Sequence, residues 1–128
     1  MCLDTVIRGK EKKAFLATLP DEIVVWKVVV LTNTGYETDC RYVPLHSGEM
    51  KFKQNVIHIR FCSLYRGGGH FWLHKKDAEG WRDIGGFDDR VVKCRIKKEW
   101  INTIGLQCGI MVLVVKKAVF PKYIGKGE

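Results

Sequence analysis

Residues 61–84 of the chain read Phe-Cys-Ser-Leu-Tyr-Arg-Gly-Gly-Gly-His-Phe-Trp-Leu-His-Lys-Lys-Asp-Ala-Glu-Gly-Trp-Arg-Asp-Ile, and the rest of the sequence is arranged around them. The three glycines at 67–69 predict a hairpin turn between two strands, because glycine adopts backbone angles that other residues avoid. Alternation after them predicts a short strand over 70–74, with Phe71 and Leu73 on one face. Residues 75–83 then predict a two-turn helix that carries one narrow apolar stripe.

Four further segments have strand patterns. Residues 23–31 are rich in β-branched side chains and are apolar at every even position, which predicts a central strand. Residues 56–62 and 91–97 alternate between apolar and polar side chains, and 110–115 are apolar throughout, as in a strand covered on both faces. Residues 36–53 contain proline, serine and glycine, which predicts mostly loop with a short edge strand.

These patterns predict a single α+β domain. We expect a curved, mostly antiparallel sheet of about five or six strands with one short helix packed on it. Residues 1–22 are expected to form an N-terminal arm or a short helix, 23–120 the α+β domain, and 121–128 a C-terminal tail. The chain has 128 residues, of which 46% are hydrophobic, so it is large enough to bury a core without disulfides or metal.

The positive charge is unevenly distributed along the chain. The net charge is +8, from 22 basic and 14 acidic residues. Residues 90–128 contain nine of the basic residues and only Glu99 and Glu128 as acids, a balance of +7, which leaves +1 for residues 1–89. Such asymmetry is typical of either a polyanion-binding surface or a solvated basic surface.

The basic residues of 91–97 follow the strand period. Val92, Cys94 and Ile96 are predicted to point inward, so that Lys93, Arg95 and Lys97 form a basic ladder on the other face. One interpretation is that the ladder binds single-stranded nucleic acid or another polyanion. The alternative is that the ladder keeps the edge of the sheet soluble and unpaired.

A second candidate surface lies in residues 61–84. Aromatic, basic and histidine side chains gather there, and exposed aromatic and basic groups on a sheet can bind single-stranded nucleic acid. The candidate ligand-binding residues are Tyr65, Arg66, His70, Trp72 and His74.

The sequence predicts no catalytic residues, no metal site and no cofactor. The five cysteines are scattered without a C-x-x-C pair, which indicates reduced thiols in a cytoplasmic protein. His70 and His74 are about 13 Å apart on a strand, too far to share a metal. No spacing pairs a cysteine or serine nucleophile with a base.

The chain also resembles two groups of known proteins. The order Trp-Lys-Val, Tyr-Arg-Gly, Gly-His-Phe, Lys-Asp-Ala and Val-Val-Lys-Cys over residues 24–117 resembles small uncharacterised proteins of phage and prophage type. The Tyr-Arg-Gly turn, the Gly-aromatic strand and the following alanine-containing helix also resemble the ADP-ribosyltransferase layout. That layout implies a nicotinamide pocket with an arginine or histidine in the first strand and a glutamate near the end of a later one, where this chain has Trp26-Lys27 and Glu99.

From the residues we expect a small binding or accessory module that is not an enzyme. Its expected partner is another protein or a second copy of the chain. The alternatives are binding of single-stranded nucleic acid or another polyanion, and an ADP-ribosyltransferase-like nucleotide-binding domain. The longest aliphatic run, residues 110–115, is far shorter than the about 20 residues of a membrane span, so we expect no membrane association.

Overall fold

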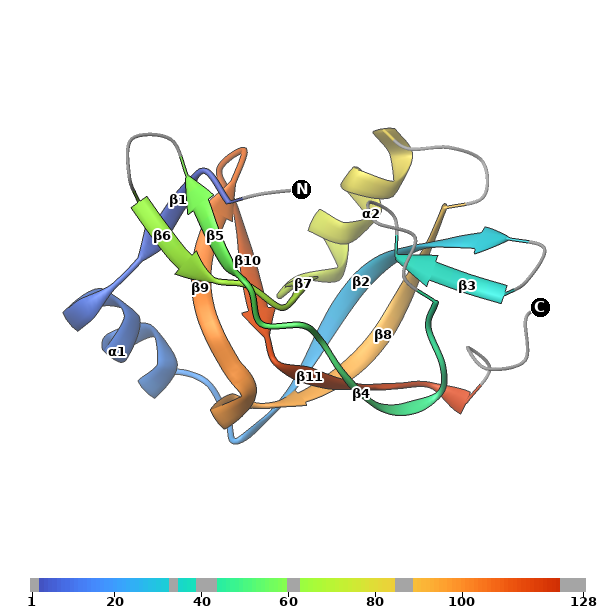
Figure 1. Ribbon diagram of the computed structural model, residues 1–128, viewed down its shortest axis with the longest axis horizontal. Helices are drawn as coiled ribbons and strands as arrows, with labels where there is room; N and C mark the ends of the chain where they lie inside the picture. Colours follow the sequence, from blue (N-terminus) through green and yellow to red (C-terminus); the bar gives the residue numbers. More distant parts are fainter. Residues whose placement is uncertain (1–2, 33–34, 39–43, 60–62, 85–88, 123–128) are drawn as a thin grey trace.

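The computed structural model describes residues 3–32, 35–38, 44–59, 63–84 and 89–122. Its elements, in chain order (Figure 1), are β1 (Thr5–Ile7), α1 (Gly9–Ala17), β2 (Glu22–Thr32), β3 (Gly35–Thr38), β4 (Gly48–Lys51), β5 (Val56–Ile59), β6 (Ser63–Arg66), β7 (Gly69–Trp72), α2 (Lys75–Ile84), β8 (Asp89–Lys97), β9 (Ile101–Gln107), β10 (Ile110–Val115) and β11 (Lys117–Phe120). A 3-10 turn, Lys98–Trp100, joins β8 to β9.

Nine of these strands form one curved sheet in which every pair is antiparallel. Its order is β1-β9-β10-β7-β2-β8-β11-β4, with β3 paired to β2, while β5 and β6 form a separate two-stranded hairpin. The predicted α+β fold with five or six strands and one helix is therefore wrong in its number of strands and helices. Most of the strands that the sequence patterns did not indicate have only three or four residues, too few to show an alternation. The seven-residue β9 was also not predicted, because it contains Asn102 and Gly105, which are typical of turns.

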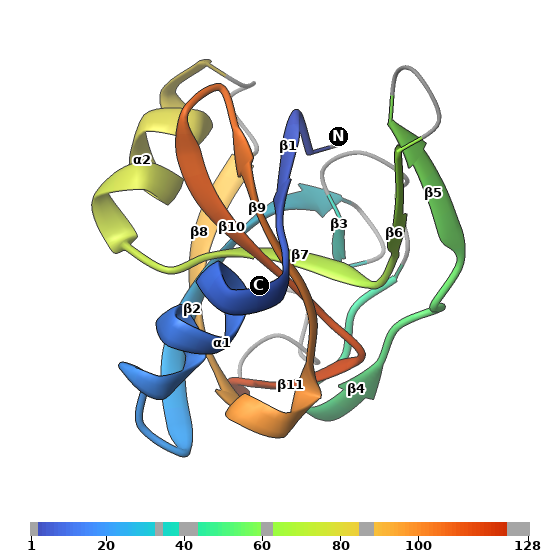
Figure 2. The same ribbon diagram turned by 90° about the vertical axis from the view of Figure 1, so that its left-hand side faces the viewer.

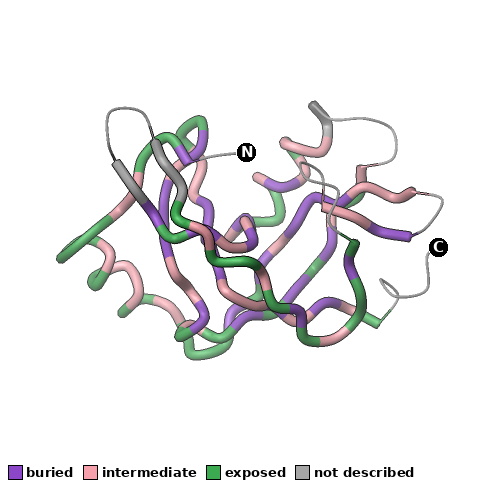
Figure 3. The backbone as a smooth tube through the Cα atoms, in the orientation of Figure 1, coloured by how far each residue is buried: buried purple, intermediate pink, exposed green. Residues whose placement is uncertain are grey.

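The inner face of the sheet encloses the main hydrophobic core. The long pairing of β2 with β8 aligns Val25 with Cys94 and Ile23 with Ile96, and all four side chains are buried. Leu113 of β10 and Phe71 of β7 continue this core across the sheet. Figure 3 shows the buried residues concentrated in these central strands. The predicted central position of residues 23–31 is confirmed, but their odd positions form the inner face, and the apolar even positions point outward.

Two elements cover parts of the outer face. The helix α2, at the predicted place, packs Ala78 and Trp81 against Val28 and Trp72. The hairpin β5–β6 places Tyr65 over Val112 and the neighbouring part of β10. Because α2 and the hairpin lie on the outer face, β10 is buried on both sides. Its uninterrupted apolar sequence predicts this burial.

The helix α1 packs against the core at one end of the curved sheet (Figure 2), through Phe15 and Leu16. The Lys98 ammonium donates hydrogen bonds to the carbonyl oxygens of Leu16 (3.1 Å) and Leu19 (2.8 Å), at and just beyond the end of α1. These bonds satisfy carbonyl groups that a helix end leaves unpaired. Because β1 pairs with β9, the N-terminal segment belongs to the same sheet as the rest of the chain.

The glycines at 67–69 do not form the predicted hairpin turn, because β6 pairs with β5 while β7 pairs with β10 and β2. They instead let the chain pass close to other groups. A Cβ atom on Gly68 would collide with the carbonyl oxygen of Val115, and one on Gly69 would lie 2.8 Å from the Phe52 ring. The short glycine segment thus connects the hairpin to the main sheet at close range.

Within the described ranges, no helix has the length and apolar character needed to cross a membrane.

Candidate functional site

The predicted basic ladder is present as a row of side chains on the outer face of β8. Lys93, Arg95 and Lys97 are exposed, while the intervening residues Val92, Cys94 and Ile96 are about 1% exposed. The predicted alternation of this strand is confirmed. The interpretation that the ladder protects a sheet edge is wrong, because β8 is not an edge strand: it lies between β2 and β11, and β11 pairs with it at Arg95.

Residues on the neighbouring strands extend this surface. Side chains of directly paired residues lie on the same face of a sheet, and Arg95 is paired both with Val24 of β2 and with Val119 of β11. On the far side, β11 and β4 bring Lys117 opposite Lys51. We call this surface the basic outer face, which consists of Glu22, Val24, Trp26, Glu49, Lys51, Lys75, Lys93, Arg95, Lys97, Lys117 and Val119.

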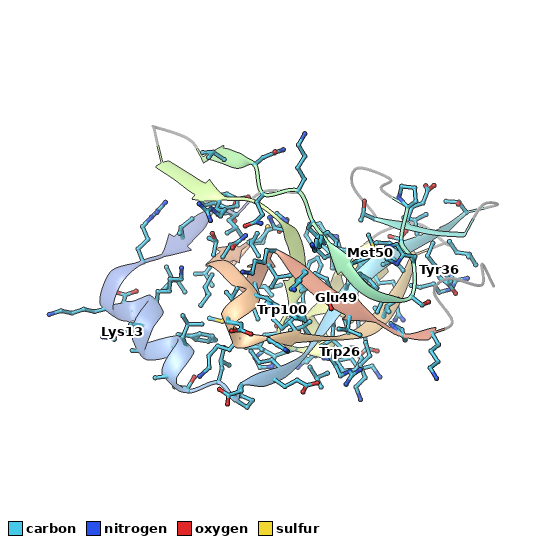
Figure 4. All side chains as sticks on the ribbon, turned by 60° about the horizontal axis from the view of Figure 1, so that its bottom comes forward. Lys13, Trp26, Tyr36, Glu49, Met50 and Trp100 are labelled. Atoms are coloured by element: carbon cyan, nitrogen blue, oxygen red, sulfur yellow. The ribbon has the colours of Figure 1, made fainter. Side chains whose placement is uncertain are left out.

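Neither α2 nor the hairpin β5–β6 shields this part of the sheet. Val24 is 42% exposed, which is unusual for a valine in an internal strand, and the three ladder residues are exposed beside it. Figure 4 brings this side of the molecule forward, with Trp26, Glu49 and Trp100 labelled. The described elements therefore leave a basic part of the outer face open to solvent.

Two tryptophans support the lysines of the basic outer face. The Lys75 ammonium lies 5.4 Å from the ring centroid of Trp26. The ammonium groups of Lys97 and Lys117 lie 5.5 and 4.8 Å from the ring centroid of Trp100, which is itself almost buried. Cation–π attraction at these distances holds the ammonium groups over the rings.

Only two carboxylates of the basic outer face offset its six cations. Arg95 forms an ion pair with Glu22 at 3.2 Å, and Lys117 forms one with Glu49 at 2.8 Å. The pKa of Glu49 is lowered, first by the hydrogen bond from Lys117, then by the charge of the same lysine, with smaller effects from Lys51 and Lys97. The response of this single carboxylate to three lysines indicates a positive local potential.

The second predicted surface is not formed as one site. Trp72 is buried beneath α2, with its ring centroid 5.7 Å from that of Trp81, whereas His74 is exposed just before the helix. Tyr65 is buried, and its hydroxyl lies 3.3 Å from Nε2 of His70. The five residues are divided because the hairpin and α2 cover different parts of β7.

Tyr65 and Arg66 instead contribute to a cavity of about 350 Å³ where β1, α1, β6 and β9 meet. The cavity is lined by Val6, Ile7, Arg8, Gly9, Lys12, Tyr65, Arg66, Asn102 and Thr103. We call it the α1 pocket. Seven of its lining residues were not predicted, because they come from segments far apart in the sequence that no local motif connects.

The thiols and histidines of the described residues do not gather into a site. Cys94 is buried in the core, and burial raises the pKa of its thiol to about 12, so this cysteine is unsuited to nucleophilic chemistry. Cys108 is exposed. No group of three or more histidine, cysteine or acidic side chains arranged to hold a metal occurs in the part of the chain that the structure describes.

The resemblances to phage-type proteins and to the ADP-ribosyltransferase layout stay predictions. Comparison of the chain with protein-family models, with curated proteins and with solved structures finds no match.

Proposed function

We propose that the protein is a non-catalytic binding module whose basic outer face binds single-stranded nucleic acid through the phosphate backbone. The observation that carries this proposal is the open outer face itself, on which six cations from four elements surround two carboxylates. A surface of one sign attracts a polyanion over a distance and releases the counterions that the polyanion carries.

The spacing of the ladder suits a single strand. Alternate residues on one strand face are about 6.6 to 7 Å apart, near the distance between neighbouring phosphates along an extended nucleic acid. Lys93, Arg95 and Lys97 can therefore meet successive phosphates, while Lys51 and Lys117 lie on the strands beyond to hold the chain from the side.

The tryptophans favour contacts to phosphate over stacking of bases. In proteins that bind by stacking, the faces of the aromatic rings are open to the bases. Here ammonium groups lie over the rings of Trp26 and Trp100. The face thus presents positioned cations, and binding of this kind tolerates any base sequence.

A salt titration tests the proposal. Fluorescence anisotropy with a labelled oligothymidylate, between about 50 and 200 mM salt, measures how the affinity falls with ionic strength. We expect Lys93→Gln/Lys97→Gln to bind more weakly and to reduce the log–log salt slope by roughly 1.4, from two contacts at about 0.7 each on a single strand.

The matched control is Lys10→Gln/Lys13→Gln. It removes the same number of lysines from exposed positions on α1, outside the basic outer face. If both double variants lose the same affinity for the oligothymidylate, only the net charge of the protein matters and the proposal is wrong. Absence of binding by the wild-type protein at low salt would also refute the proposal. In the second case a protein partner becomes the better hypothesis.

A further inference from the structure

We propose that the α1 pocket is a separate binding site for a small phosphate monoester. It would be a second site on the molecule, and it does not depend on nucleic-acid binding at the basic outer face. The volume of about 350 Å³ lies at the small end of the range for small-molecule sites. The pocket and its lining side chains carry the inference.

The charged groups of the pocket all have the same sign. Arg8 precedes α1, Lys12 lies on its first turns, and Arg66 ends β6, so two segments far apart in the sequence bring three cations to one cavity. None of the nine lining residues is acidic. A cavity with three cations and no carboxylate in its wall is suited to an anion, and an arginine can bind phosphate through two parallel hydrogen bonds.

Hydrogen bonds between the walls hold the pocket in shape. The Lys12 ammonium donates to the carbonyl oxygen of Asn102 at 2.9 Å, which ties α1 to β9. The Thr103 hydroxyl donates to the carbonyl oxygen of Arg66 at 3.0 Å, and the Asn102 amide donates to the carbonyl oxygen of Gly67 at 3.1 Å. A pocket that is already ordered loses little conformational entropy when a ligand enters.

The other part of the wall is suited to a small organic group. Val6 and Ile7 provide apolar surface beside the cations, and the almost buried Tyr65 also lines the pocket. The Tyr65 hydroxyl accepts a hydrogen bond from the Leu3 amide at 3.4 Å and contacts His70, so the ring has a fixed position. The combination of cations and apolar wall is suited to a phosphate attached to a small apolar substituent, and the proposed ligand class is a small phosphate monoester, of which phenyl phosphate is the probe.

The test is an NMR titration of the ¹⁵N-labelled protein with phenyl phosphate, with inorganic phosphate and phenol, the two parts of that ester, as controls. We expect saturable shifts at Gly9, Arg66, Asn102 and Thr103, with tighter binding of phenyl phosphate than of either control. Shifts confined to β8, or shifts that do not saturate, would overturn the proposal.

Substitutions locate the site. Arg66→Gln should weaken phenyl phosphate about tenfold, because it removes a charge-assisted bidentate contact. The affinity of Arg66→Lys for phenyl phosphate should fall between those of Arg66→Gln and wild type, because lysine keeps the positive charge but lacks the two parallel N–H donors of the guanidinium group. Lys13 lies at an exposed position on α1, and its side chain projects away from the molecule (Figure 4). Lys13→Gln removes one charge there and should leave the affinity for phenyl phosphate unchanged.

The spectra of the variants also report whether they fold. If Arg66→Gln keeps the dispersed wild-type spectrum and binds phenyl phosphate as tightly as wild type, the proposal is wrong. Equal weakening by Lys13→Gln would likewise overturn it, since net charge alone would then explain the binding. If Arg66→Gln loses its dispersed spectrum, Arg66→Lys takes its place in the test. The proposal is then wrong if Arg66→Lys binds phenyl phosphate as tightly as wild type, or if Lys13→Gln weakens binding as much as Arg66→Lys does.

Discussion

Glu49 lies among the lysines of the basic outer face and neutralises part of their charge. Because its pKa is lowered in the folded state, mainly by the hydrogen bond from Lys117, its ion pair stabilises the fold at pH values above the ordinary carboxyl pKa. That stabilisation is lost as the pH falls through the lowered value. Glu49 is exposed and Lys117 is partly exposed, so we expect the effect of the pair on stability to be small and its effect on the potential of the surface to be larger.

We therefore predict that Glu49→Gln binds a single-stranded oligonucleotide more tightly than wild type, by about two- to fivefold at low salt, because one nearby negative charge is removed. The melting temperature at pH 7 should change little. Glu11→Gln, at an exposed position on α1, is the control and should leave the affinity unchanged. Weaker binding by Glu49→Gln in the anisotropy titration would contradict the assigned surface.

Lys27 shows at the residue scale what the sequence patterns could not predict. It lies in the β-branched run of β2 and faces inward, where its ammonium donates to the His70 carbonyl oxygen at 2.8 Å and lies 4.7 Å from the Phe71 ring centroid. A charged residue normally indicates an outward position. The charge made the odd positions of β2 look less apolar than the even ones, although the odd positions form the inner face.

At the scale of elements, the clearest predictions concern elements whose side chains show a regular period. The strands β2, β8 and β10 and the helix α2 have six to eleven residues each, and their patterns indicated them. The strand β9 has seven residues, but it contains Asn102 and Gly105, which are typical of turns, and it was not predicted. The strands β1, β3, β4 and β11 have three or four residues. Such short strands are specified by pairing with distant partners, which local propensity does not reveal.

Lys98 contributes to the attachment of α1, beside the bond from Lys12 to Asn102 and the packing of Phe15 and Leu16. Replacing Lys98 with methionine keeps the aliphatic stem but removes the bonds to the carbonyl oxygens of Leu16 and Leu19. We expect Lys98→Met to lower the free energy of unfolding by about 1–3 kcal/mol. Hydrogen exchange of the α1 amides should become faster than in Lys13→Met, and unchanged exchange would show that Lys98 does not hold the helix.

At the scale of the whole molecule, the outer face of the sheet has covered and open parts. The helix α2 and the hairpin β5–β6 cover the apolar parts, and the basic part stays exposed. The ladder residues of this site could be predicted because they alternate within one strand. Lys51, Lys75 and most residues of the α1 pocket could not, because only the order of the strands brings them together.

The part of β10 that the hairpin β5–β6 covers leads to a prediction about the stability of the fold. Val112 is fully buried between the core and the hairpin, so Val112→Asp places an unpaired charge in an apolar site and should cost about 4 kcal/mol or more, enough to unfold a domain of marginal stability. Val56→Asp changes the same residue type at a position that is 64% exposed, and it should unfold near the wild-type temperature. Circular dichroism melting measures both, and similar melting temperatures would contradict the described burial of β10.

The most direct test of the nucleic-acid interface is the mapping of an oligothymidylate onto the ¹⁵N-labelled protein by NMR at low salt. We expect shifts at Lys93, Arg95 and Lys97, together with Val24, Lys117 and Lys51 on the neighbouring strands, and we expect these shifts to disappear as salt is raised. Shifts centred on α2 or the hairpin β5–β6, or no shifts at low salt, would contradict the assignment of the basic outer face as a nucleic-acid interface.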